Sequence, residues 1–201
     1  MSWIATVARP DATGRLREMY DRIAGPDGAI DNVLRIHSLR PHTLEGHMAL
    51  YKNVLHHPGN TLPKWLLETV GVYVSLLNGC NYCVAHHFAG LRRLLHDDAR
   101  ADAMRAALQT GVFDDVFAPR ERGILEYAGQ LTREPRAVAE AAIEALRAVG
   151  LADGEILEVN QVASYFAYVN RTVLGLGVNT EGDTLGLSPN DSNDEGNWQH
   201  T

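Results

Sequence analysis

Hydrophobic residues recur every three or four positions along most of the chain. In segment 12–24, Leu16, Met19, Tyr20 and Ile23 have the spacing that places side chains on one face of an α-helix. We find no segment that alternates hydrophobic and polar residues as a half-buried strand does. The pattern therefore predicts an all-α helical bundle of about seven to eight helices. These helices cover 12–24, 42–57, 62–77, 80–96, 99–110, a segment that begins at Pro119, a segment from Pro135 to Gly150, and a long segment that begins at Asp153.

Polar residues, proline and glycine mark the ends of these helices. Thr61 and Pro63 predict the start of helix 62–77, with a capping hydroxyl and then proline in the first turn. Asn78-Gly79 predicts its end, and Asp153 is the expected cap of the last helix. Helix 62–77 is hydrophobic on nearly all sides, so we expect it to be buried.

The last residues of the chain have a different composition. Residues 180–201 are rich in Gly, Asn, Asp and Ser, and they contain five acidic residues and no Lys or Arg. Such a segment has little hydrophobic surface to bury, so we expect a poorly ordered acidic tail. The sequence thus predicts one helical domain over 1–179 and a tail over 180–201.

Composition excludes several classes of protein. The chain of 201 residues is 45% hydrophobic and 21% charged, which is typical of a globular domain. A net charge of −7 argues against nucleic acid as a partner. No uninterrupted hydrophobic stretch approaches 18 residues and no secretory signal is visible, so we expect no membrane association and a cytoplasmic location.

Two cysteines carry the most specific signal in the sequence. Cys80 and Cys83 form a C-x-x-C pair, and in a reducing compartment such a pair is more often catalytic or metal-binding than structural. His87 lies four residues after Cys83, which places both on one helix face. Glu68 lies twelve residues before Cys80, roughly 18 Å away along a straight helix. If the chain turns at Asn78-Gly79, the two helices pack as a hairpin and Glu68 returns close to His87.

The predicted position of the cysteines also favours redox chemistry. Cys80 and Cys83 occupy the first turn of helix 80–96, where unpaired N–H groups and the helix dipole favour a thiolate. A thiolate attacks an O–O bond to give a sulfenic acid, and a second thiol condenses with that acid to form a disulfide. Glu68 and His87 would assist as a proton relay, directly or through water.

Two other interpretations of the cysteine pair remain open. The spacing could arise by chance between two buried cysteines. Alternatively, Cys80, Cys83 and His87 could supply three zinc ligands, with Glu68 or His86 as the fourth. A thioredoxin-type site is not indicated, because the βαβ pattern that accompanies it is missing from the sequence.

The motif Glu68-x11-Cys80-x2-Cys83-x3-His87 resembles the alkylhydroperoxidase D/carboxymuconolactone decarboxylase family, and most of all its peroxidase-related branch. Residues 32–38, 157–160 and 165–171 also resemble this branch. The resemblance implies an all-α fold, a homo-oligomer (dimer, trimer or hexamer), and reduction of a hydroperoxide at the expense of an unknown dithiol reductant, without a cofactor or metal. It further implies that Cys83 attacks the peroxide, that Cys80 resolves the sulfenic acid to a disulfide, and that Glu68 and His87 form the relay.

One residue departs from the family pattern. Alkylhydroperoxidase D has a histidine just before the second cysteine, whereas this chain has Tyr82, whose phenol titrates near ~10 and is a poor base at neutral pH. Tyr82 and His86 are possible auxiliary residues, although His86 fits a surface or interface position better. We therefore predict an antioxidant thiol peroxidase. The alternatives are a non-redox carboxymuconolactone decarboxylase-like enzyme and a zinc-binding or redox-sensing protein.

Overall fold

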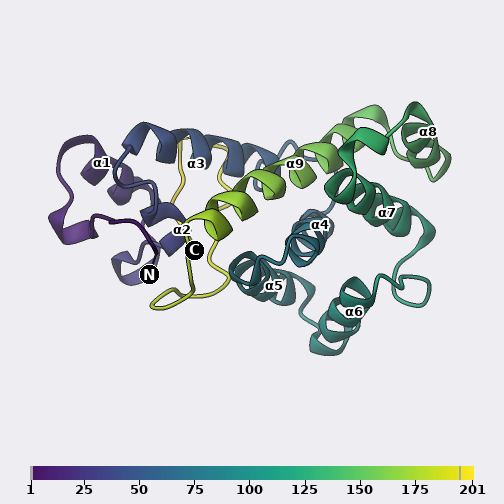
Figure 1. Ribbon diagram of the computed structural model, residues 1–201, viewed down its shortest axis with the longest axis horizontal. Helices are drawn as coiled ribbons and strands as arrows, with labels where there is room; N and C mark the ends of the chain where they lie inside the picture. Colours follow the sequence, from purple (N-terminus) through teal and green to yellow (C-terminus); the bar gives the residue numbers. More distant parts are fainter. Residues whose placement is uncertain (1, 195) are drawn as a thin grey trace.

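The computed structural model describes residues 2–194 and 196–201. These residues form helices and connecting segments, and the only extended pairing among them is an isolated bridge between Pro189 and His200. The all-α prediction is confirmed (Figure 1). The α-helices are α1 (Gly14–Ile23), α2 (Asn32–Arg35), α3 (Pro41–Leu55), α4 (Lys64–Leu77), α5 (Asn81–Leu95), α6 (Asp98–Thr110), α7 (Pro119–Arg133), α8 (Glu140–Ala148) and α9 (Asp153–Gly175), with short 3₁₀ turns at Arg9–Asp11, Pro26–Gly28 and Pro135–Ala137.

Helix α4 lies at the centre of the bundle. It packs against α5, α7 and α9, and Val70, Val72 and Val74 on different sides of it are all fully buried. Gly71 allows α9 to approach closely, because a Cβ there would lie 2.2 Å from the Phe166 ring. The close contact fixes the middle of α9 directly over the middle of α4.

The expected hairpin between α4 and α5 is present. Gly79 has a φ of 69°, a left-handed conformation that glycine adopts without strain, and the Cys80 N–H donates to the Ser75 carbonyl at 2.9 Å. The chain therefore reverses between the helices, and α5 lies alongside α4.

Helices α1, α2 and α3 form one end of the molecule, and α6, α7 and α8 lie toward the other (Figure 1). Helix α9 runs diagonally between the two ends and contacts α3, α4, α7 and α8. The hydrophobic core is continuous along this length, from Leu16 in α1 to Leu146 in α8.

Some helix boundaries differ from the prediction. Pro63, not Thr61, is the N-cap of α4, because the Thr61 hydroxyl donates instead to Glu158 at 3.0 Å. The predicted helix from Pro135 to Gly150 is divided into a 3₁₀ turn and α8. Ala152, not Asp153, is the N-cap of α9.

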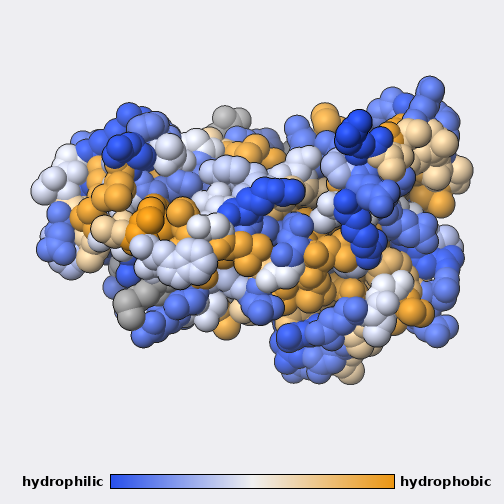
Figure 2. Space-filling model, viewed as in Figure 1, coloured by the Kyte–Doolittle hydropathy of each residue, from blue (hydrophilic) through white to orange (hydrophobic). Residues whose placement is uncertain are grey.

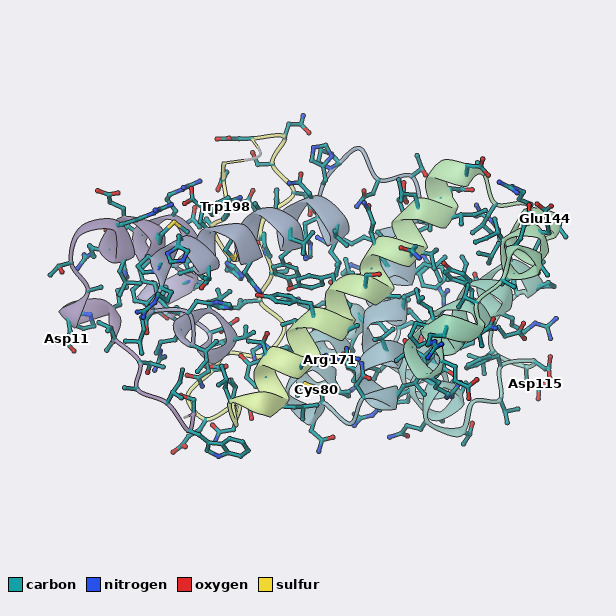
Figure 3. All side chains as sticks on the ribbon, turned by 45° about the horizontal axis from the view of Figure 1, so that its top comes forward. Asp11, Cys80, Asp115, Glu144, Arg171 and Trp198 are labelled. Carbon is teal, nitrogen blue, oxygen red and sulfur yellow. The ribbon has the colours of Figure 1, made fainter. Side chains whose placement is uncertain are left out.

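The expectation of a poorly ordered tail also needs correction. The described residues after 180 contain no helix, yet they return to the N-terminal helices as the yellow chain in Figure 1 and pack there. Trp198 is 5% exposed beneath the Arg22 guanidinium, and His200 Nδ1 lies 2.9 Å from the Ile23 carbonyl. Figure 3 places the labelled Trp198 close to the N-terminal helices.

Cations on the helices hold this segment in place. The Lys52 ammonium, fully buried, donates to the Asn190 carbonyl, and Lys64 pairs with Asp191 at 2.6 Å. Gly186 approaches α5 so closely that an added Cβ would lie 3.0 Å from the Gly90 nitrogen. Composition alone did not predict this docking, because the partners of these polar residues are distant in the sequence.

Candidate active site

A pocket of about 260 Å³ lies between α3, α4, α5, α9 and the C-terminal segment. It contains most of the residues that the sequence singled out. Its lining includes Asp31, His47, Tyr51, Glu68, Tyr82, Cys83, His86, His87, Tyr165 and Val169, and from the C-terminal segment Gly186, Leu187, Ser188 and His200.

The two cysteines meet at the start of α5. Cys80 is the N-cap residue and Cys83 lies in the first turn; their Sγ atoms are 2.8 Å apart and both are free thiols. Cys83 lines the pocket, whereas Cys80 is fully buried. A small side-chain movement brings the sulfurs to the disulfide distance of about 2.05 Å.

The two thiols differ in acidity. A hydrogen bond from Cys83 lowers the pKa of Cys80, and backbone N–H groups of Tyr82 and Cys83 add to this effect. The hydrogen bond to Cys80, together with burial, raises the pKa of Cys83 well above its usual value. The sequence predicted that the helix N-terminus would favour a thiolate in this turn. In the structure the helix N-terminus lowers the pKa of Cys80, because Cys80 is the N-cap residue and lies against the free N–H groups of the first turn.

Glu68 and His87 form the predicted pair across the helical hairpin. Glu68 Oε2 lies 2.8 Å from His87 Nδ1, and Glu68 is only 3% exposed. On the other side, Glu68 Oε1 lies 3.9 Å from the buried His56 Nε2. The Phe166 ring meets His87 edge-on at 4.6 Å and limits its rotation. His87 is therefore fixed in the pocket that also contains Cys83.

Asn170 is a site residue that sequence reasoning did not identify individually. Its amide donates to the Ser75 hydroxyl at 3.1 Å and accepts from Asn78 at 2.9 Å. It also forms hydrogen bonds that lower the pKa of both thiols. The signal available in the sequence was an asparagine among the hydrophobic residues of the last helix, between Val169 and Val173, and the structure buries it fully. Figure 3 shows α9 crossing next to Cys80, near Arg171.

Tyr82 and His86 belong to a second polar group. The Tyr82 hydroxyl donates to Asp183 Oδ2 at 2.6 Å and accepts from the Val33 N–H at 3.1 Å. His86 stacks on the Tyr82 ring at 4.5 Å and lies 3.3 Å from the same Asp183 oxygen. The expectation of a surface position for His86 is therefore wrong: it is 7% exposed, and Asp183 from the C-terminal segment covers it.

An aromatic wall completes the pocket. Tyr51 stacks on Tyr165 with ring centroids 5.4 Å apart, and His47 lies 5.8 Å from Tyr165. Burial lowers the pKa of His47 to about 3 and that of His200 to about 4, so both imidazoles are neutral at physiological pH. The wall therefore favours an uncharged ligand with an apolar body.

The described residues contain neither a metal-binding cluster nor a membrane-spanning helix. No three His, Cys, Asp or Glu side chains are grouped so that they could hold a metal ion. None of the described helices is long and apolar enough to cross a membrane.

Residues 41–128 match the carboxymuconolactone decarboxylase family. This segment extends from α3 into α7 and includes Glu68, Cys80, Cys83 and His87. This match, together with the solved structures described next, supports a resemblance to the alkylhydroperoxidase D/carboxymuconolactone decarboxylase family. No functionally curated protein matches the sequence significantly.

Several solved structures share this fold over most of the chain. An uncharacterized peroxidase-related protein from Ralstonia eutropha JMP134, with an alkylhydroperoxidase D core, is 24% identical to this chain, with a TM-score of 0.75. The similarity covers 89% of this chain and 92% of the Ralstonia protein. A peroxidase-related protein from Silicibacter sp. TM1040 is 27% identical with a TM-score of 0.65, covering 78% and 82%. The debrominase Bmp8, solved with 2,3,4-tribromopyrrole, is 16% identical with a TM-score of 0.69, covering 88% and 90%, and shares the fold.

Proposed function

We propose that this protein is a thiol-dependent hydroperoxide reductase. The observation that supports it best is one pocket holding a reactive dithiol and an acid–base pair. Cys83 lines the pocket with Cys80 2.8 Å behind it, and the same pocket contains His87 hydrogen-bonded to Glu68 at 2.8 Å. A carboxylate–imidazole pair beside a nucleophile is the arrangement that activates thiols in enzymes.

Cys83 is the attacking thiol in this proposal because a substrate in the pocket can reach it. His87, oriented by Glu68, takes the Cys83 proton. The Cys83 thiolate then attacks the terminal oxygen of the hydroperoxide, the O–O bond breaks, and Cys83 becomes a sulfenic acid as an alkoxide departs. The alkoxide becomes the alcohol when it gains a proton.

Cys80 is suited to the second step. Its lowered pKa makes it the more readily ionised thiol, and it lies in contact with Cys83. Its thiolate attacks the Cys83 sulfenic acid, an S–S bond forms, and the departing hydroxide takes the proton held by His87 to become water. One hydroperoxide has then been reduced and two thiols have been oxidised. An external dithiol, whose identity is unknown, must return the disulfide to the dithiol state.

Thiol counting combined with turnover tests this proposal. One equivalent of tert-butyl hydroperoxide should remove two titratable thiols from the reduced protein, and excess dithiothreitol should then support continuous consumption of hydroperoxide. Loss of two thiols without turnover would indicate a redox sensor instead. Retention of both thiols would favour a non-redox decarboxylase-like enzyme, which has no use for a disulfide.

A further inference from the structure

The pocket contains a second set of ionisable side chains, separate from Glu68 and His87. His86 and Asp31 both line the pocket, and both are less than 10% exposed. Behind His86, the Asp183 side chain is fully buried, and its Oδ2 lies 3.3 Å from His86 Nε2. The thiol steps described above use none of these residues.

Two donors hold the Asp183 carboxylate. The Asn32 N–H lies 3.1 Å from both carboxylate oxygens, and the Tyr82 hydroxyl donates at 2.6 Å. Because its oxygens are committed to these donors, the Asp183 carboxylate has a fixed position 3.3 Å from His86 Nε2, and Tyr82 stacks on the face of the His86 ring. The other ring nitrogen, Nδ1, lies on the side of Asp31.

A gap separates the side chains of His86 and Asp31. His86 Nδ1 and Asp31 Oδ2 are 3.9 Å apart, too far for a direct hydrogen bond. Within residues 2–194 and 196–201, no side chain or backbone N–H donates to the Asp31 carboxyl. Two polar groups at this separation, both facing a pocket, suit an oxygen atom that bridges them.

The alkoxide that leaves in the first step of hydroperoxide reduction needs a proton. An alkoxide is a strong base, so the O–O bond breaks readily only if the departing oxygen receives a proton. His87 is occupied with the proton from Cys83. A separate acid on the far side of the substrate would therefore accelerate the first step.

Building on the hydroperoxide reductase function, we propose that His86 and Asp31 bind the departing oxygen and protonate it, and that Asp183 and Tyr82 position His86. The His86–Asp31 pair gives one proton to the alkoxide to form the alcohol. It regains a proton through solvent when Cys80 ionises for the second step, so no proton is lost or gained overall. Burial raises the pKa of the Asp31 carboxyl to about 6, so this carboxyl keeps its proton to a higher pH than an exposed one.

Two oxidants of similar size separate this role from a structural one. tert-Butyl hydroperoxide releases an alkoxide, which needs a proton, whereas peracetic acid releases a carboxylate, which does not. His86→Gln and Asp31→Asn should each lower kcat/KM for tert-butyl hydroperoxide by about 10²–10⁴. Both variants should keep most of the peracetic acid rate. His42→Gln, at an exposed position in α3, is the matched control and should leave both rates unchanged.

The ratio of the two rates is independent of the fraction of protein that is folded, so it stays meaningful if a variant is partly unstable. Asp183→Asn provides a third variant: it keeps the size of the side chain but loses its charge, and it should shift the ratio in the same direction by a smaller factor. An equal loss with both oxidants, or unchanged rates, in His86→Gln and Asp31→Asn would overturn the proposed acid. If the wild-type protein reduces neither oxidant, the reductase function itself fails, which is a distinct result.

Discussion

Replacing Glu68 with glutamine tests the proton relay. Glutamine keeps the size of the side chain and one hydrogen bond to His87, but it cannot carry the charge that stabilises a protonated imidazole. The contact is 2.8 Å long and buried. A hydrogen bond to a charged group is worth about 1.5–3 kcal/mol, which corresponds to about 10- to 150-fold in rate. Complete loss of a general base costs about 10²–10⁴-fold in rate. Glu68→Gln keeps His87 and removes only its charged partner, so we expect kcat/KM for the hydroperoxide to fall by about 10²-fold, where the two ranges overlap.

The pH dependence separates this role from a structural one. Because the hydrogen bond to Cys80 and burial raise the pKa of Cys83, we expect the wild-type protein to depend on His87 to remove that proton at neutral pH. Above the thiol pKa, Cys83 ionises without help, so the difference between wild type and Glu68→Gln should shrink as pH rises. Rates would be measured across pH, with circular dichroism as a check on folding. Glu126→Gln, on an exposed face of α7, is the matched control. Equal rates for Glu68→Gln and wild type at neutral pH would refute the relay.

Four further predictions follow from the structure. Cys83→Ser should abolish hydroperoxide consumption, and Cys80→Ser should leave a sulfenic acid on Cys83 that a dimedone label reports by mass spectrometry; a label on Cys80 in active Cys83→Ser protein would reverse the roles. Light scattering should give a multiple of 22.1 kDa, because hydrophobic side chains remain exposed on the face shown in Figure 2; the mass of one chain contradicts this. Burial raises the pKa of Asp31 from 3.8 to about 6, so the folded state binds this proton more tightly than the unfolded state does. The free energy of unfolding therefore falls as pH rises from 3.8 to about 6. Asp31→Asn should therefore raise the free energy of unfolding at pH 7.5 by up to about 3 kcal/mol and flatten this slope, and chemical denaturation that shows no gain is the contrary result. Gly186→Ala should destabilise the protein by about 1–2 kcal/mol in thermal melts, because φ there is 84° and the new Cβ would crowd Gly90; an unchanged melting temperature argues against the docked C-terminal segment.

Local patterns in the sequence were enough to predict the central hairpin. The hydrophobic residues around Glu68 predicted a buried α4, and Asn78-Gly79 predicted the turn that brings Glu68 back to His87. Both signals act over a few residues, so they can be read without knowledge of the rest of the fold. The same holds for Cys80 and Cys83, whose separation of one helical turn sets their contact.

The parts of the site that involve distant segments could not be predicted in this way. Asp183 contacts Tyr82 across 101 residues, and its surroundings in the sequence are typical of a solvated loop. The difference in acidity between Cys80 and Cys83 depends on the hydrogen bond between them and on the position of Cys80 as the N-cap, and a shift of one or two residues in the helix start would move the free N–H groups away from Cys80. Patterns of single residues do not fix a boundary that closely.

Product analysis after a single turnover shows whether Cys80 and Cys83 together reduce a hydroperoxide. Reduced protein would be mixed with one equivalent of tert-butyl hydroperoxide, quenched with acid, digested and examined by mass spectrometry, with tert-butanol measured in the same sample. We expect one Cys80–Cys83 disulfide and one molecule of tert-butanol for each chain. Unmodified cysteines alongside intact hydroperoxide would contradict it.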